Sequence, residues 1–441
     1  MRKGVGQSVA LASLTALAVA LVTTPLGTGA TSKRATVEAS KAQAARGPRG
    51  PRGKRGFRGP RGFRGFLGAP GANGQQGVPG TPGLQGASGI ERSGFVLSAL
   101  DTTGVVGQDT SVVIGADGLG LISYRDLSSA TLKVAHCESL ACATSTKSTV
   151  AMGAGQFSSI TIGSDGLGLI SYYDAASGDL KVAHCTNLTC SASTSAALDS
   201  AGDVGRDTSI TIGADGLGLI SYLDFSNSDL KVAHCSNIAC TAATTTTLDA
   251  GTVVGHTSIT LGADGLGLIG YHGLGLDVAH CSDVVCATAT TTTLDSVPAI
   301  GTSVNVGGDG LGLISYRDGI GQDLRVAHCT NLACSAKTIV VLDSAGDVGT
   351  YNSTTIGADG MAVVSYSDST NGDLKIARCT NVACSAATSA TVDSAGITGL
   401  YTSATIGADG LGLVAYQDDT NDDLRVAHCS NVFCIPHFRR R

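Results

Sequence analysis

Short runs of β-branched and aliphatic residues alternate with polar turns along residues 94–441, and the same alternation recurs seven times. The copy that begins at Asp207 contains four such runs: TSITIG (208–213), LGLISY (217–222), LKVAHC (230–235) and TTTTL (244–248). Short β-branched runs bounded by turn residues are typical of strands. Between the first two runs, Asp215 and Gly216 suit a tight hairpin turn, where positive φ is tolerated. Each copy therefore predicts four antiparallel strands.

The repeat length indicates the architecture. The first cysteines of successive copies lie 48, 50, 46, 48, 50 and 50 residues apart, and four strands in such a period correspond to one blade of a β-propeller. The last copy stops without a fourth strand, whereas residues 95–101 (FVLSALD) match the fourth strands of the other copies. An open solenoid would not need complementary ends. We therefore predict an all-β fold, a closed seven-bladed propeller over 94–441, with the N-terminal strand 95–101 completing the last blade.

Composition indicates what fills and cross-links these blades. The chain has no Trp and only 4% aromatic residues, so Leu, Ile, Val and Ala must form the core. All 14 cysteines lie in the repeats as Cys-x4-Cys pairs, which predicts one disulfide per hairpin and an oxidising compartment. The alternative is a metal site with His136, Cys137 and Cys142 as ligands, but a structural zinc needs four ligands and no fourth recurs. The predicted disulfides are Cys137–Cys142, Cys185–Cys190, Cys235–Cys240, Cys281–Cys286, Cys329–Cys334, Cys379–Cys384 and Cys429–Cys434.

The N-terminus predicts export. Arg2 and Lys3 precede an apolar stretch over residues 9–22, and small residues around 27–30 follow. This order is typical of a secretory signal peptide, here residues 1–30, cleaved near Ala30. A transmembrane span needs about 20 apolar residues, so an uncleaved anchor is the alternative interpretation. Residues 31–46 are interpreted as a disordered linker.

Residues 47–89 have a glycine at every third position. Only Gly fits the axis of a collagen triple helix, so the strict period predicts a triple-helical stalk and a homotrimer. A flexible glycine-rich linker would not need this period. Basic side chains fill the first half of the stalk, where they suit anionic polymers or else stabilise the rod. These polyanion-binding candidates are Arg49, Arg52, Lys54, Arg55, Arg58, Arg61 and Arg64.

The charge of the chain is divided between its two parts. Residues 1–90 hold 13 Lys and Arg and one Glu, which is a net charge of +12. The remaining residues hold 16 basic and 34 acidic side chains, which is a net charge of −18. A basic stalk thus precedes an acidic head, and the overall value of −6 conceals the division.

This order of segments resembles bacterial collagen-like surface and secreted proteins, which have a signal peptide, a short variable region, a Gly-X-Y stalk and a globular head. The resemblance covers residues 1–90 and implies an extracellular or cell-surface location. It does not extend to the head, because such proteins carry unrelated heads. Within the head, the signatures of WD40 and kelch propellers are absent. The Asp-Gly turns are similar to Asp-box turns of sialidase-type propellers, but the aromatic partner of that motif is missing.

Three sets of polar residues recur along the copies. The histidines before the first cysteines are interpreted as hydrogen-bond donors to a neighbouring loop, because catalysis normally needs one distinct place; Arg378 replaces this residue in the sixth copy. They are His136, His184, His234, His280, His328 and His428. The Tyr-x-Asp pairs and the acidic turns after them would suit Ca²⁺ or a sugar, or would simply form turns, which we favour. The pairs are Tyr124/Asp126, Tyr172/Asp174, Tyr222/Asp224, Tyr316/Asp318, Tyr366/Asp368 and Tyr416/Asp418, and the turn residues are Asp179, Asp229, Asp323, Asp373, Asp422 and Asp423.

The fourth copy differs from the others. The connection between its second and third strands, residues 271–276, is short and lacks the acidic turn. His256 and His272 have no equivalent in the other copies. A notch in the ring or simple drift would each explain the difference, so this blade is the first place to look for a particular site. Otherwise the copies are too similar to choose a binding face.

These observations favour binding over catalysis. No nucleophile motif, P-loop, HExxH or dinucleotide fingerprint is present, so we expect no catalytic, metal or cofactor-binding residues, with Ca²⁺ as the alternative. We predict a secreted or cell-surface structural and adhesion protein, whose trimeric stalk displays propeller heads and raises weak affinities by avidity. Its partners would be an extracellular glycan, a matrix protein or an anionic wall polymer, with no specific nucleic acid and no transmembrane span after signal cleavage. The alternatives are a sialidase- or lyase-like enzyme, disfavoured because no repeat-breaking acidic, Tyr or Arg cluster is seen, and a lectin, disfavoured by the few aromatic residues.

Overall fold

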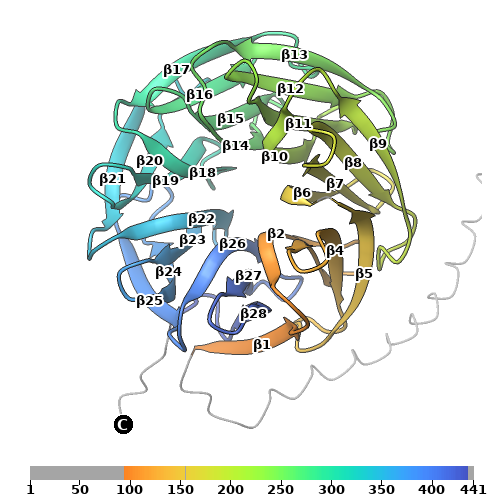
Figure 1. Ribbon diagram of the computed structural model, residues 1–441. Helices are drawn as coiled ribbons and strands as arrows, with labels where there is room; N and C mark the ends of the chain where they lie inside the picture. Colours follow the sequence, from red (N-terminus) through yellow and green to blue (C-terminus); the bar gives the residue numbers. More distant parts are fainter. Residues whose placement is uncertain (1–93, 154, 436–441) are drawn as a thin grey trace, which may run out of the picture. The chain divides into compact units, whose positions relative to one another are not determined.

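Seven four-stranded antiparallel sheets are arranged as blades around one axis (Figure 1). The structure is a computed structural model, and it describes residues 94–153 and 155–435. Each blade runs outward from an inner strand beside the axis to an outer strand at the rim. The predicted signal peptide, linker and stalk lie outside the described residues.

The strands occupy equivalent positions in all seven blades. The inner strands are β2 (Val106–Ile114), β6 (Gln156–Ile162), β10 (Val204–Ile212), β14 (Gly255–Leu261), β18 (Ala299–Val306), β22 (Val348–Ile356) and β26 (Thr398–Ile406). The second strands are β3 (Gly120–Asp126), β7 (Gly168–Asp174), β11 (Gly218–Asp224), β15 (Gly267–His272), β19 (Gly312–Asp318), β23 (Ala362–Asp368) and β27 (Gly412–Asp418). The third strands are β4 (Thr131–Cys137), β8 (Asp179–Cys185), β12 (Asp229–Cys235), β16 (Leu276–Cys281), β20 (Leu324–Cys329), β24 (Asp373–Cys379) and β28 (Asp423–Cys429). The outer strands are β5 (Ser145–Met152), β9 (Ser193–Asp199), β13 (Ala243–Asp249), β17 (Ala289–Asp295), β21 (Lys337–Asp343), β25 (Ala387–Asp393) and β1 (Phe95–Asp101).

The two ends of the propeller meet in one blade. β1 pairs antiparallel with β28, so that Phe95 lies opposite Cys429, and the blade has the order β1-β28-β27-β26. The first strand of the propeller in the sequence is therefore the outer strand of its last blade (Figure 1). The predicted fold class, an all-β propeller with seven four-stranded blades, is confirmed.

The core lies between adjacent blades. The second strand β11 is buried at every position, because neighbouring blades cover both faces of its sheet. The outer strand β13 instead exposes several threonines to solvent. One apolar cluster joins Ile220 and Tyr222 of one blade to Leu169 and Leu180 of the preceding blade. Leu, Ile, Val and Ala thus fill the core as their abundance predicts, and each blade adds at least one buried tyrosine.

The buried tyrosine takes part in a polar tie between blades. The hydroxyl of Tyr222 donates to Asp199 of the preceding blade at 2.7 Å, and the Lys231 ammonium lies 2.5 Å from the same carboxylate. Burial alone would raise the pKa of Asp199, but the hydrogen bonds from Lys231 and Tyr222 outweigh it and hold this pKa below its usual value. Equivalent ties join Tyr124, Asp101 and Lys133; Tyr316, Asp295 and Arg325; Tyr366, Asp343 and Lys375; and Tyr416, Asp393 and Arg425.

The tie is missing between the first two blades, which provides a matched experiment. Ala151 lies opposite Leu132 where Asp199 lies opposite Leu180, and Lys181 pairs with Asp174 of its own blade instead. We expect Asp199→Ala to lower the free energy of unfolding by about 1.5–3 kcal/mol, because it leaves a buried hydroxyl and ammonium without their carboxylate. Ala151→Asp should shift the urea midpoint in the opposite direction by adding a carboxylate near Tyr172 and Lys181. Equal midpoints for both variants and the parent would show that the tie contributes nothing.

Candidate functional site at the central opening

Each inner strand has a residue in the left-handed backbone region at one equivalent position, two residues before a serine. This residue lies in a β-bulge, and its φ is between 49° and 64° in all seven strands. A positive φ is unstrained for Gly and costs other residues on the order of 1–3 kcal/mol. Only one of the seven positions holds Gly. We call these positions the ring residues: Asp109, Phe157, Asp207, His256, Gly301, Tyr351 and Tyr401.

The two residues after each ring residue join neighbouring blades. The second of them is always Ser, and its hydroxyl accepts a hydrogen bond from a backbone N–H of the next blade at 3.0–3.2 Å. These serines are Ser111, Ser159, Ser209, Ser258, Ser303, Ser353 and Ser403. Because the acceptors form a complete circle, this position cannot vary without opening a joint between inner strands.

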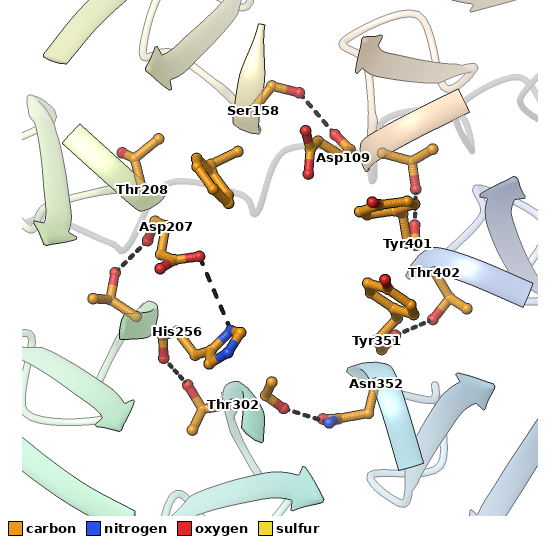
Figure 2. A pocket seen from close by; sticks show the side chains of 14 residues that line it. Asp109, Ser158, Asp207, Thr208, His256, Thr302, Tyr351, Asn352, Tyr401 and Thr402 are labelled. Atoms are coloured by element: carbon orange, nitrogen blue, oxygen red, sulfur yellow. Dashed lines mark hydrogen bonds and ion pairs between the residues drawn. The ribbon is translucent and has the colours of Figure 1, made fainter. Parts of the chain in front are cut away.

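The residue directly after the ring residue forms a second set of joints. In six of the seven blades its hydroxyl or amide donates to the backbone carbonyl of the ring residue in the preceding blade: Ser158 to Asp109 at 2.9 Å, Thr257 to Asp207 at 2.7 Å and Thr402 to Tyr351 at 2.8 Å. Thr110, Thr302 and Asn352 make the equivalent contacts (Figure 2). In the third blade, Thr208 donates to the Ser171 hydroxyl instead. The bonds to the ring residue use only its backbone. Its side chain can therefore differ between blades without changing the joints.

The side chains of the ring residues converge on the central opening of the propeller (Figure 2). The cavity that they line has a volume of about 180 Å³. Pockets that enclose drug-sized ligands measure about 300–1,000 Å³, so this opening suits one chemical group of a larger ligand. It is the place where seven similar blades present six side chains of four kinds (Asp, Phe, His and Tyr) and one glycine.

One side of the opening carries an acid and a histidine, and a second histidine is stacked on the first. Asp207 and His256 come from neighbouring inner strands, and their carboxylate and ring nitrogen lie 4.0 Å apart. His272 of β15 stacks on His256 with 6.2 Å between ring centroids. Burial lowers the pKa of His272 to about 4, and the nearby His256 acts in the same direction. His272 is therefore neutral at neutral pH.

The other side carries two tyrosines and a second acid. The rings of Tyr351 and Tyr401 lie 4.5 Å apart. Burial raises the pKa of Asp109 to about 6, and repulsion from Asp207 adds to the rise, although a backbone hydrogen bond from Phe157 and the charge of Arg125 oppose it. Burial also raises the pKa of Tyr401, which keeps its hydroxyl protonated. Asp109 is thus a carboxyl group that changes charge near physiological pH.

The opposite end of the propeller is constant from blade to blade. There the Asp-Gly turns of adjacent blades approach closely around the axis: a Cβ placed on Gly118 would lie 3.4 Å from Cβ of Ala408. His136 bonds to the carboxylate of Asp117 in the turn of its own blade at 2.8 Å. His184, His234, His280, His328 and His428 pair with Asp165, Asp215, Asp264, Asp309 and Asp409, and Arg378 pairs with Asp359. These residues hold turns, as their repetition predicts.

Seven disulfides lie at the same end, and they include all the predicted pairs. The Cα atoms of each pair are 4.8–5.0 Å apart. Within residues 94–153 and 155–435, no group of three or more His, Cys, Asp or Glu could hold a metal ion. The Tyr-x-Asp aspartates bond to their own turns: Asp224 accepts from the backbone N–H of Asn227 at 3.1 Å, and Asp368 accepts from Asn371 at 3.1 Å. These aspartates thus stabilise turns.

The short connection in the fourth blade leaves a small cavity of about 150 Å³ beside Tyr271, Asp249 and Asp277. Asp277 occupies the position of Lys231 in the third blade. Of the two alternatives, the notch is therefore the one present; its lining includes neither His256, which lines the central opening, nor His272.

The central opening corrects two conclusions drawn from the sequence. The copies do differ at one face, and a repeat-breaking cluster of acids and tyrosines does exist. Its signal in the sequence is the residue before each Thr-Ser, Ser-Ser or Asn-Ser pair, which reads Asp, Phe, Asp, His, Gly, Tyr and Tyr along the copies. Only His256 and His272 were identified without the structure. The cationic candidates from Arg49 to Arg64 lie outside the described residues.

Comparison with known proteins supports both parts of the chain. Residues 42–93 match the family model for the collagen triple helix repeat. The N-terminal segment is collagen-like. No curated protein matches the chain. In the part described by the structure, no helix is long and apolar enough to cross a membrane.

Solved structures show the same propeller fold at low sequence identity. BBS1N in complex with ARL6DN has a TM-score of 0.52 and 9% identity, covering 78% of this chain and 99% of that chain. An ulvan lyase of a polysaccharide lyase family has a TM-score of 0.51 and 10% identity, covering 73% and 94%. A binding protein and an enzyme thus share this fold, so the fold alone does not assign a function.

Proposed function

We propose that this chain is an extracellular adhesion protein in which three collagen-like stalks join and display three propeller heads, each binding a ligand at its central opening. The collagen repeat supports the trimer, because a triple helix needs three chains. The seven disulfides support an oxidising, extracellular location.

One observation carries the assignment of the opening. Six of the seven ring positions hold Asp, Phe, His or Tyr in a backbone conformation that suits Gly. The fold itself does not require these side chains, because the joints around them use backbone atoms and the neighbouring hydroxyls. Side chains that are kept at a strained position, and that differ from blade to blade, are expected at a binding site. The constant opposite end then serves as the scaffold.

A polysaccharide-acting enzyme is the second candidate, and Asp109 favours it. Its pKa of about 6 suits a general acid or base near neutral pH. Asp207, His256 and Tyr401 on the same opening supply further groups of the kind that such chemistry uses. An enzyme would convert a bound glycan into a product, whereas an adhesion protein would bind it unchanged.

The test is binding of the full-length protein to an array of glycans, matrix proteins and wall polymers, with product analysis of each bound glycan. A stalk variant, Gly65→Ala with Gly68→Ala, interrupts the triple helix and leaves single heads. We expect the trimer to bind at least tenfold more tightly than the single heads, because linked heads rebind at high effective concentration.

Two head variants locate the site in this experiment. Tyr401→Leu alters the opening, whereas Thr247→Ala alters an exposed position of the outer strand β13. Loss of binding in the first and full binding in the second are expected. Equal binding by both variants would contradict the assignment of the opening as the binding site. Formation of a product from a bound glycan would show that the protein is an enzyme instead of an adhesion protein.

A further inference from the structure

The charged groups at the central opening are mainly anionic. Asp109 and Asp207 both line the opening, and the charge of Asp207 raises the pKa of Asp109. His272 is neutral at neutral pH because burial holds its pKa near 4. Two arginines on the strands beside the opening are neutralised: Arg206 lies 2.6 Å from Asp203, and Arg317 lies 2.8 Å from Asp347. Arg125 is the cation that acts on Asp109.

Aromatic faces border the same space. Tyr351 and Tyr401 form a pair at the opening, and Phe157 lines it between the two acidic ring residues. An aromatic face attracts a cation through its quadrupole, and carboxylates beside it add a full negative charge. An anionic sugar or polymer would instead meet the two carboxylates and be repelled by them. The combination of acids and aromatic rings therefore favours a positively charged ligand.

Resting on the proposed binding role of the opening, we propose that its ligand is a cationic group, an alkylammonium or a guanidinium, which contacts the Asp109 and Asp207 carboxylates and the rings of Tyr351 and Tyr401. The size of the cavity, about 180 Å³, suits one such group at the end of a side chain or polymer unit. The ring residues are the specificity-determining residues of this site.

Two sources could present this chemistry. One is an external ligand that carries amines, and the other is the arginine-rich stalk of a neighbouring trimer, since residues 1–90 carry a net charge of +12 and the rest of the chain −18. Binding of the second kind would link trimers into a network. The experiment must therefore separate a site that is filled by the protein itself from one that is open to other molecules.

The first arm titrates full-length protein with choline, lysine methyl ester, arginine methyl ester, glucose and glucuronate, using calorimetry at fixed ionic strength. We expect the three cations to bind and the neutral and anionic sugars not to bind. Asp109→Asn and Asp207→Asn should each weaken cation binding. Tyr401→Phe should retain it and Tyr401→Leu should weaken it several-fold, because only the former keeps an aromatic face.

The second arm uses pH, because the opening contains a carboxyl group that titrates in the accessible range. With a pKa of about 6, Asp109 is ionised above pH 6 and becomes neutral as the pH falls through this value. A ligand that needs the ionised form should bind about tenfold more weakly at pH 5 than at pH 7. The other titratable and charged groups that face this region are Asp207, His256, His272, Tyr351, Tyr401 and Arg125. Protonation of His272, whose pKa is about 4, would also disfavour a cation, but only well below pH 5. Asp109→Asn should remove most of the dependence.

The third arm identifies the source. Sedimentation of full-length protein is compared with that of a variant in which the stalk arginines 49–64 are replaced by glutamine. Salt-sensitive association beyond the trimer that disappears in both the glutamine variant and Asp207→Asn assigns the stalk as ligand. Probe binding without such association assigns an external cation.

Any of four outcomes would overturn the inference. Binding of glucuronate in preference to choline, or an affinity that rises as the pH falls, would show that the opening selects anions. If Tyr401→Leu leaves every interaction of the protein unchanged, the opening is not a binding site and the proposed function fails with it. A neutral glycan whose binding depends on Tyr401 but not on Asp109 or Asp207 would refute the cationic ligand. The opening would then remain the binding site.

Discussion

A chain in which Phe95–Asp101 is replaced by a Gly-Ser segment of equal length is expected to lose the folded propeller at physiological temperature. Phe95 and Leu100 are 2% and 6% exposed, and both leave the core in this variant. Each contributes about 1.5–3 kcal/mol through burial. The antiparallel pairing with β28 is lost as well, together with the Asp101 carboxylate that binds Tyr124 and Lys133. The sum approaches the whole stability of a typical domain, about 5–15 kcal/mol.

The control for this experiment moves the strand instead of removing it. In the third blade, the outer strand begins at Ala243, three residues after Cys240. Attaching FVLSALD at the same spacing after Cys434 should restore the fourth strand of the last blade from the other end of the chain. We expect recovery of the melting midpoint and of protease resistance. A replaced chain that melts like the parent without this rescue would contradict the role of β1 in closing the ring.

The strands and their order could be predicted because each blade solves the same packing problem. Apolar β-branched runs mark β11 and β12, and the missing last strand marks the closure. The starts of the inner strands were predicted less accurately. The run from Thr208 suggests a start that is four residues late, since β10 begins at Val204. The bulge at Asp207 interrupts the two-residue alternation on which a strand is recognised. A bulge is set by backbone conformation, which the pattern of apolar residues does not record.

The site was harder to predict than the fold because it depends on contacts between blades. His256 and His272 are distinctive within one copy, so the sequence alone identifies them as unusual. Their partner Asp207 comes from the preceding blade, about fifty positions away in the sequence. The repeated histidines and aspartates are conspicuous in the sequence for the opposite reason, because they recur in the copies. In the structure these recurring residues stabilise turns. In a ring of similar blades, the information about function lies in the residues that do not repeat.

The ring residues should therefore contribute to binding at the expense of stability. We expect Asp207→Gly to raise the free energy of unfolding by about 1 kcal/mol, because Gly adopts the positive φ of 49° without strain. The Asp207 carbonyl still accepts the hydrogen bond from Thr257, and the repulsion on Asp109 is relieved. Gly301, which occupies this position in the fifth blade, shows that the joint tolerates Gly. Ligand binding by the same variant should fall at least tenfold.

Ser209→Ala is the matched variant, two residues away in the same strand. Its hydroxyl accepts the N–H of Ile259 at 3.1 Å across the joint between blades and does not line the opening. Its removal should lower the free energy of unfolding by about 1 kcal/mol and leave ligand affinity within twofold of the parent. Urea denaturation and binding measured on the same preparations would show the two effects in opposite directions. If Asp207→Gly instead destabilised the propeller and kept full binding, the side chains of the ring would serve the fold, and the ligand would have to bind elsewhere on the head.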